Sequence, residues 1–455
     1  MNTDPYIIGD STVKEPPTSF VHKLKFLGPG FILSASIVGS GELIATTTLG
    51  AKAGFAAFWI IILSCLAKVA VQLEFGKHTI LSGETAIQAF AKLPGPKIGK
   101  GKWAVWMVLV ALILKLVQVG GILGGTAIIL NMLFPSFSIL SWTLITAMVA
   151  ASLIFKGYYS TIEKLSLLMI TLFTVLTLAS LYFLKYTPYS FSWNNIIHNA
   201  QFNLSGEVTA VAIGAFGITG VASDEIIAYT YWCIEKGYAA YVGPRSETPE
   251  WKARAQGWIN VMYLDAIVAM TLYTSVTAAF YLLGAAVLHH RGEVPDENHL
   301  VETLSLIFTQ SLGQGSRIAF LVGGFFVLFS SVFATLAAWT RVFPDIFSQL
   351  GWTDFGNILE RKKIIAVVSW VLPFAWATTF LFMKVPLVMV LSGGMVGSVL
   401  LFMVVFAGLH FRYKRMQLSR PGLFYDTALW ISIISILGVG IYGVVKIFAH
   451  LEFLI

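Results

Sequence analysis

Three carboxylates lie inside long apolar stretches, where a helix that crosses a membrane normally carries none. Glu42 stands in the segment GSGELIA (39–45), and Asp224 and Glu225 stand in the segment ASDEIIA (222–228). A charge at the middle of a bilayer costs roughly 2.5 kcal/mol or more on insertion scales, so it indicates a functional site. The three carboxylates therefore mark a candidate substrate site.

The two segments resemble each other, with Ser40 matching Ser223 and Glu42 matching Glu225. Their glycines and serines weaken the helix, and the freed backbone groups must then face protein, water or a substrate. Broken helices at corresponding places in two halves are typical of a transporter's binding site. A weaker third break is expected at 392–397. The predicted substrate contacts are Gly39, Ser40, Gly41, Glu42, Ala222, Ser223, Asp224, Glu225 and Gly393.

A structural role for these residues is the alternative. Ser40 and Ser223 are plausible caps of the second half-helices, and Glu42 and Glu225 would then stabilise the positive helix ends. Two such carboxylates together with Asp224 are more than capping needs. A substrate role is therefore favoured.

The elements that must position these residues are membrane helices. The chain has 455 residues, of which 57% are hydrophobic and only 12% charged, whereas soluble domains carry about 25% charged residues. This composition excludes a soluble protein, and runs of about 18 apolar residues predict eleven spans. These runs lie near 27–55, 57–76, 103–130, 137–155, 165–184, 206–232, 259–288, 318–340, 364–382, 385–410 and 428–449.

The expected organisation is an all-α integral membrane protein with an inverted repeat of five plus five helices. Residues 1–26 form an N-terminal tail, whose first 20 residues are polar and expected to be disordered. Residues 27–410 form the transport domain, with repeats at about 27–184 and 206–410, and residues 411–455 add a loop and the eleventh helix. The distribution of lysine and arginine in the loops places the N-terminus in the cytoplasm and the C-terminus outside, in the plasma (inner) membrane.

The first span resembles that of the Nramp family of proton-coupled divalent-metal transporters. The sequence GPGFILSASIVGSGELIATTTLGAKAGFAAFW follows the family's first-span pattern without a gap. SGETAIQAF and SSVFATLAAWTR resemble its segments after the second span and in the eighth. The resemblance implies a leucine-transporter-type fold with broken helices 1 and 6 and a metal bound between them.

The departures from the family pattern concern the metal site and the proton path. The family's Asp-Pro-Gly-Asn is here Gly39–Glu42, and its Met-Pro-His falls within 221–224, so no sulfur ligand remains. The family's acidic proton-path positions fall near Gln118 and Gly121. Lys115 lies one turn before Gln118, and we expect it either to pair with a carboxylate or to put a fixed positive charge where the family has its proton path.

Because carboxylate oxygens suit hard cations, the expected metal ligands are Glu42, Asp224 and Glu225. A hard cation such as Mg²⁺ or Mn²⁺, moved without protons, is therefore favoured. The chain is similar in this respect to the Nramp-related magnesium transporters.

Other functions remain as alternatives. A small anion or zwitterion, such as bicarbonate or an amino acid, could bind the freed N–H groups of the breaks, although the three acidic residues would repel it unless lysines compensate. A non-transporting receptor would normally add a large soluble domain. We expect no enzyme and no cofactor, because the sequence shows no nucleophile–base set or nucleotide motif. The expected partners are the transported ion and the lipid bilayer, without nucleic acid, and a monomer is compatible with these features.

Overall fold

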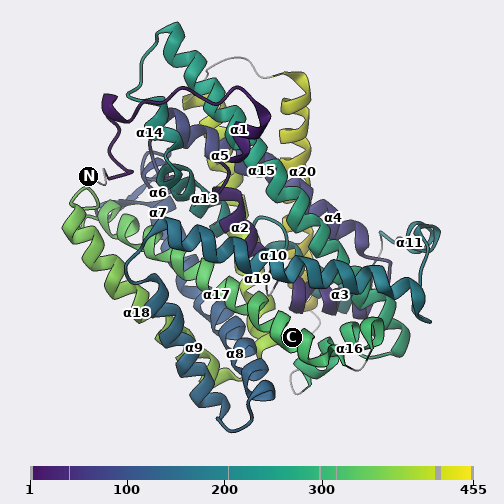
Figure 1. Ribbon diagram of the computed structural model, residues 1–455. Coiled ribbons are helices and arrows are strands. Elements are labelled where there is room, and N and C mark those ends of the chain that lie inside the picture. The colour runs from purple at the N-terminus through teal and green to yellow at the C-terminus, as the bar shows by residue number, and fades with distance from the viewer. Residues whose placement is uncertain are drawn as a thin grey trace.

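The structure is a computed structural model that describes residues 4–39, 41–202, 204–296, 299–313, 315–415 and 422–451. Apart from one short β-ribbon, its regular elements are helices (Figure 1). An apolar chain in a bilayer satisfies its backbone groups within each helix, because hydrocarbon offers them no partner.

The elements of the first half end with α10. They are η1 (Asp10–Thr12), α1 (Phe20–Leu24), α2 (Pro29–Ile37), the π-helix η2 (Gly41–Thr46), α3 (Thr47–Ala53), α4 (Phe58–Ala67), α5 (Val69–Ser82), α6 (Ala86–Phe90), β1 (Lys97–Ile98), β2 (Gly101–Lys102), α7 (Trp103–Leu114), α8 (Leu116–Leu133), α9 (Ile139–Ile154) and α10 (Tyr159–Phe183). Strands β1 and β2 pair antiparallel, with Lys97 opposite Lys102.

The second half continues to the end of the described chain. Its elements are η3 (Leu184–Tyr186), α11 (Trp193–Asn199), α12 (Gly206–Ile218), α13 (Ser223–Lys236), α14 (Tyr238–Val242), α15 (Pro249–Leu283), the π-helix η4 (Gly284–His289), α16 (Leu300–Leu312), α17 (Ser316–Gln349), α18 (Ile358–Met383), α19 (Pro386–His410), the π-helix η5 (Phe411–Arg415) and α20 (Leu423–Leu451).

The helices agree with the predicted spans. Within the described residues, nine helices are long and apolar enough to cross a membrane, and the bent pair Pro29–Ile37 and Gly41–Ala53 makes a tenth. The predicted span 137–155 corresponds to α9, a shorter apolar helix of 16 residues. At 1.5 Å per residue α9 is about 24 Å long, somewhat less than the roughly 30 Å of hydrocarbon.

Two of the three expected breaks are present. The first break (residues 38–40) separates α2 from η2, and the two parts are bent by 42°. The second break (residues 219–222) separates α12 from α13. The predicted third break at 392–397 is wrong, because α19 is a continuous helix over Pro386–His410. Its small residues serve close packing instead: a Cβ added at Gly394 would lie 2.3 Å from the carbonyl oxygen of Gly214 in α12.

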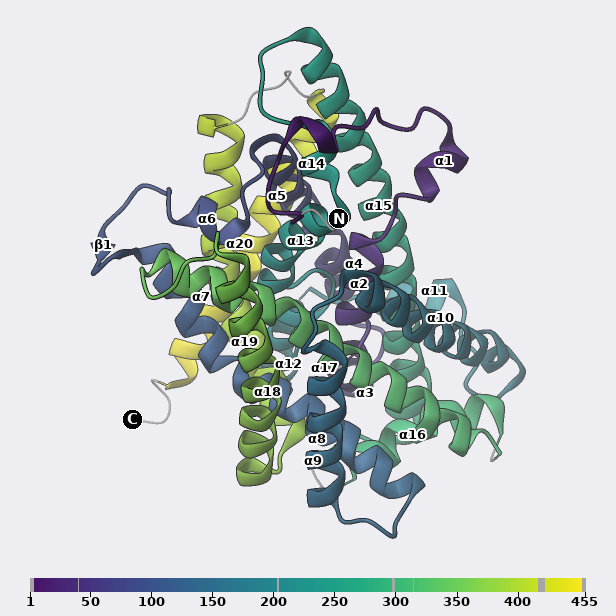
Figure 2. The same ribbon diagram turned by 60° about the vertical axis from the view of Figure 1, so that its left-hand side comes forward.

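The broken helices lie inside a ring of longer helices (Figure 2). Helix α2 packs against α10, α13, α15 and α17, while α12 packs against α19, which also packs against α8. The start of α2 is fixed from outside its own segment. Gly28 stands at the N-cap position without a side chain, and the carboxylate of Asp265 in α15 accepts hydrogen bonds from the backbone N–H groups of Gly28 (2.8 Å) and Gly30 (2.7 Å).

The N-terminal tail is ordered from residue 4, so the predicted disorder is wrong. The hydroxyl of Tyr6 donates to Glu235 at 2.8 Å, and Arg361 donates to Asp4 at 2.7 Å. Farther along, Lys14 N–H donates to the carbonyl of Tyr241 at 3.0 Å. These bonds attach the tail to α13, α14 and α18, whereas sequence composition reports only that the tail is polar.

Candidate functional site

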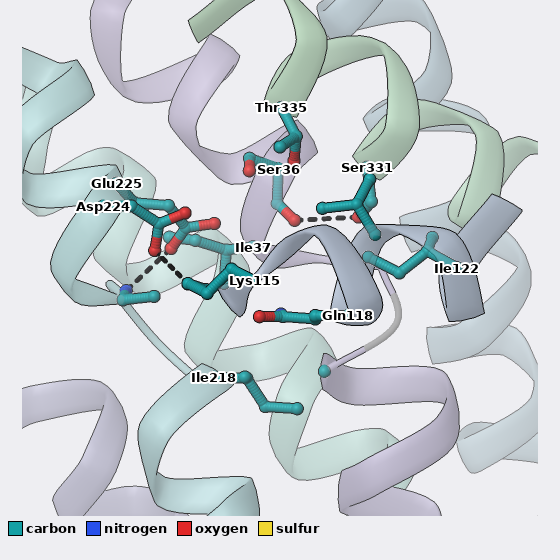
Figure 3. A pocket seen from close by; sticks show the side chains of 13 residues that line it. Ser36, Ile37, Lys115, Gln118, Ile122, Ile218, Asp224, Glu225, Ser331 and Thr335 are labelled. Atoms are coloured by element: carbon teal, nitrogen blue, oxygen red, sulfur yellow. Dashed lines mark hydrogen bonds and ion pairs between the residues drawn. The ribbon is translucent and has the colours of Figure 1, made fainter. Parts of the chain in front are cut away.

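A small cavity lies between the two broken helices, with α8 and α17 completing its wall (Figure 3). The space open to water-sized molecules is about 30 Å³, enough for about two waters or a partly hydrated ion. Its lining residues are Ser36, Ile37, Gly41, Lys115, Gln118, Val119, Ile122, Ile218, Ala222, Asp224, Glu225, Ser331 and Thr335. The side of the cavity formed by the second break carries both acidic residues.

The start of α13 presents Asp224 and Glu225 to the cavity. Ala222 is the N-cap residue of α13, and its backbone N–H donates to Glu225 Oε2 at 2.7 Å. Ser223 is therefore the first helical residue and not the cap that the sequence suggested. The N-terminal end of a helix favours negative charge, so both acidic side chains lie at the end of α13 that suits them.

Lys115 lies opposite these acids at the junction of α7 and α8. Its ammonium forms an ion pair with Asp224 Oδ1, and only 2% of its side chain is exposed, compared with 12% for Asp224. Figure 3 shows this pair beside Glu225. The sequence led us to expect Lys115 either as a buried lysine paired with a carboxylate or as a replacement on the family's proton path, and the structure confirms the pairing, with a predicted metal ligand as the partner.

Within the described part of the chain, two buried polar atoms near the ion pair have no hydrogen-bond partner. They are the amide oxygen of Gln118, which lines the cavity, and the hydroxyl of Ser223. Buried polar groups are nearly always paired, so each unpaired one calls for an explanation such as a bound water or ion. Together with Asp224 and Glu225, these oxygens form a set of hard donors beside one small space.

At the first break, the glutamate lies away from the cavity. Glu42 is fully buried and is absent from the described cavity lining, which includes Gly41 but neither Gly39 nor Glu42. Its carboxylate accepts a hydrogen bond from Gly39 N–H at 3.1 Å and another from the hydroxyl of Thr277 at 3.1 Å. The capping alternative therefore describes the contacts of Glu42 well. Ser40 lies outside the described residues.

Two glycines among the predicted residues serve packing in the structure. A Cβ added at Gly393 would lie 2.2 Å from Gln118 Cβ, and one added at Gly121 would lie 2.8 Å from Met389 Cβ. Gly121 and Gly393 therefore bring α8 and α19 close together. That approach helps to fix Gln118 beside the cavity, although neither glycine lines it.

Hydroxyl groups from α17 complete the site and were not predicted. Ser331 and Thr335 line the cavity, and Ser331 donates to the carbonyl of Ser36 at 2.9 Å. That carbonyl belongs to the last turn of α2, beside the first break. The spacing of four residues, which places Ser331 and Thr335 on one helix face, was the available signal.

Lys68 holds the end of α12 in a comparable way but with a charge. It is fully buried, and its ammonium donates to the carbonyl of Thr219 at 2.6 Å and to that of Phe216. Ser64 donates to the same two carbonyls at 3.0 and 3.1 Å. Cations are favoured at the C-terminal ends of helices, so Lys68 stabilises the chain at the second break.

The predicted metal ligands do not form one ready cluster. Across the described ranges, no group of three or more His, Cys, Asp or Glu side chains is placed to hold a metal ion. Asp224 and Glu225 are adjacent, while Glu42 lies behind the first break. A metal bound here would need oxygen from neutral groups as well, and the neutral polar side chains that line the cavity are those of Ser36, Gln118, Ser331 and Thr335.

Comparison with known proteins finds relatives and solved structures that match most of the chain. A divalent metal cation transporter of Pseudomonas aeruginosa, MntH 1, is 22% identical over an alignment of 401 residues. The alignment covers 82% of this chain and 86% of that protein. The structure of the manganese transporter of Eremococcus coleocola superposes with a TM-score of 0.69 at 16% identity, covering 97% of this chain and 92% of that one. MhsT, in complex with L-phenylalanine, superposes with a TM-score of 0.56 at 18% identity, covering 94% and 100% of the two chains.

These likenesses confirm the leucine-transporter-type fold that the resemblance implied. The family described as natural resistance-associated macrophage protein-like (Nramp) matches residues 30–446, which include both breaks and the cavity. The expectation of a membrane transporter and not an enzyme is confirmed with it. The chain therefore belongs to the Nramp family.

Proposed function

We propose that this protein transports a hard divalent cation, Mg²⁺ or Mn²⁺, by alternating access, with the ion bound at the second break. One observation carries the proposal: Asp224, Glu225 and the unpaired amide oxygen of Gln118 converge on the same buried cavity. The names of the relatives, a divalent metal cation transporter and a manganese transporter, support it.

The donor set favours a hard ion. The residues that line the cavity offer carboxylate, amide and hydroxyl oxygens, and none of them contains sulfur. Thioether and thiolate ligands select softer transition metals, whereas oxygen ligands suit Mg²⁺ and Mn²⁺. Mg²⁺ also keeps several of its waters when it binds to proteins, and the cavity has room for about two.

The charge of the cavity favours a cation over an anion. Its lining contains two carboxylates, Asp224 and Glu225, but one ammonium, that of Lys115. The lysine balances one of the acids, so the cavity keeps a net negative charge when both acids are ionised. The bicarbonate alternative would require a second positive charge in this wall.

We further propose that transport is not coupled to protons. The positions where the family has acidic proton-path residues correspond to Gln118 and Gly121, and neither side chain titrates. In proteoliposomes that contain a pH-sensitive dye, Mn²⁺ entry should leave the internal pH unchanged. Acidification that depends on Mn²⁺ would refute this part of the proposal.

The cargo is tested by binding and uptake with purified protein. Mn²⁺ and Mg²⁺ should bind and accumulate in proteoliposomes, whereas bicarbonate and amino acids should not compete. Gln118→Leu should weaken Mn²⁺ binding about tenfold, because it removes one ligand oxygen at a cost near 1.4 kcal/mol. Gln256→Leu is the matched control, since Gln256 bonds to Asn260 and does not line the cavity. Binding of bicarbonate or amino acids, without binding of either cation, would overturn the proposal.

A further inference from the structure

The ammonium of Lys115 occupies the place where a bound cation would meet Asp224. It pairs with Asp224 Oδ1 across the cavity, from the α7–α8 junction to the first turn of α13. The two residues lie on different helices, 109 positions apart in the sequence. The pair thus connects a helix of the first repeat with the second break.

The surroundings of this ammonium leave it room to change partners. An ammonium has three N–H donors, and among the described contacts its one polar partner is Asp224. The hydroxyl of Ser223 is buried and unpaired, and a Cβ added at Gly397 would lie 3.7 Å from both Lys115 Nζ and Ser223 Oγ. Among the described contacts, the lysine is therefore held by one ionic contact, and it lies next to Gly397, which has no side chain to confine it.

We propose that Lys115 is a built-in counter-cation: it neutralises Asp224 when the site is empty, and the transported cation displaces it. A divalent ion and an ammonium cannot share this carboxylate closely, because like charges repel strongly in a site shielded from water. Binding of the cargo therefore breaks the Lys115–Asp224 pair, and release of the cargo restores it. The identity of the displacing ion rests on the proposed function, whereas the ion pair itself does not.

Such a counter-cation has two consequences. It makes the site selective for charge, since Na⁺ or K⁺ brings no more positive charge than the lysine that it must displace, whereas Mg²⁺ or Mn²⁺ brings twice as much. It also pairs with the carboxylate of Asp224 after the cation leaves, so that this buried charge always has a partner. An unpaired buried charge is costly, so the lysine would allow the empty transporter to change conformation without a coupling ion.

The test compares wild type with Lys115→Met and Lys115→Arg. Lys115→Met keeps an unbranched side chain that is one atom shorter and removes the charge, and it should tighten Mn²⁺ binding at least tenfold, equivalent to about 1.4 kcal/mol. It should also let Na⁺ compete with Mn²⁺, measured by calorimetry in sodium chloride against choline chloride. Lys115→Arg keeps the charge and should stay close to wild type in both respects.

A second measurement uses the wild-type protein and does not depend on a variant that folds. Reductive methylation followed by mass spectrometry should label Lys115 several times faster when Mn²⁺ is present, because the ion frees the amine. Lys236, which pairs with Glu163 at 2.6 Å outside the cavity, is the internal reference and should not change.

The outcomes separate the two proposals. If wild type binds Mn²⁺ but Lys115→Met binds it equally or more weakly, or if Mn²⁺ does not increase labelling of Lys115, the counter-cation is overturned and the cation transporter stands. If neither wild type nor the two variants bind Mn²⁺ or Mg²⁺, both proposals fail.

Discussion

The two helix breaks share one local hydrogen bond and differ in the residues that surround it. In each, a glutamate accepts a hydrogen bond from the backbone N–H three residues earlier: Glu42 from Gly39 and Glu225 from Ala222. At the first break the remaining contacts are neutral, with Thr277 on Glu42 and Ser331 on the carbonyl of Ser36.

At the second break the surroundings are charged. Asp224 stands next to Glu225 and pairs with Lys115, while Lys68 binds the carbonyls at the end of α12. Two helix breaks of similar sequence therefore take different roles. The first is closed by hydrogen bonds from a backbone N–H and from hydroxyl groups, and the second holds an ion pair beside Glu225, where we propose that the cation binds.

The largest expected effect separates the two glutamates. Glu225→Gln should weaken Mn²⁺ binding about 100-fold, equivalent to about 2.7 kcal/mol, because an anionic ligand in the cavity wall is lost. Glu42→Gln should change it less than about threefold, because Glu42 bonds to Gly39 and Thr277 behind the wall; the amide oxygen can keep the bond from Gly39, and the amide NH2 can donate to the hydroxyl of Thr277 instead of accepting from it. Calorimetric titration with Mn²⁺ measures both, and Glu250→Gln at an exposed position is the control. Equal losses for Glu42→Gln and Glu225→Gln would remove the distinction between the breaks.

The next largest expected effect is on stability and comes from replacing the glycines of the two breaks, Gly39 and Gly220. Gly220 has φ +61°, and an added Cβ would lie 2.8 Å from Cys65 Cα, so Gly220→Ala meets both backbone strain and a backbone clash. At Gly39 the added Cβ would meet a side chain, Ser331 Oγ, at 1.6 Å. Each single change should lower the midpoint of thermal unfolding, with a cost of about 1–3 kcal/mol from overpacking.

A second-site change distinguishes these two positions. Ser331→Gly removes the clashing atoms and should recover much of the stability of Gly39→Ala in the double variant. Ser64→Gly leaves the Cα of Cys65 in place and should not rescue Gly220→Ala. If Gly39→Ala were not improved by Ser331→Gly, its constraint would lie in the backbone, as at the second break.

The smallest effect concerns the hydroxyl on Glu42. Thr277→Val removes the donor at 3.1 Å from Glu42 Oε1 and should lower stability by about 1 kcal/mol. Because Glu42 lies behind the cavity, the affinity for Mn²⁺ should stay within about threefold. Thr271→Val on the exposed face of the same helix is the control, as Thr271 donates only locally, to Ile267. A large loss of Mn²⁺ affinity in Thr277→Val alone would indicate that Glu42 contributes to the site.

The sequence by itself determined the membrane helices and the positions of both breaks. Apolar runs must become helices in hydrocarbon, because no other partner is available to the backbone. The glycines and acids inside the runs at 39–42 and 220–225 marked the two interruptions. The same logic failed at 392–397, because small residues also serve close helix packing, and α19 packs closely on α12 through Gly394.

Only the tertiary structure decided which residues meet. The ion pair of Lys115 with Asp224, the cap that Asp265 places on α2 and the bonds of Lys68 to the end of α12 join residues 109, 237 and 151 positions apart. No local pattern specifies such partners, since they depend on how the helices pack. For the same reason GSGELIA and ASDEIIA looked equivalent in the sequence, and the helices around them gave one of them neutral contacts and the other the charged wall of the cavity.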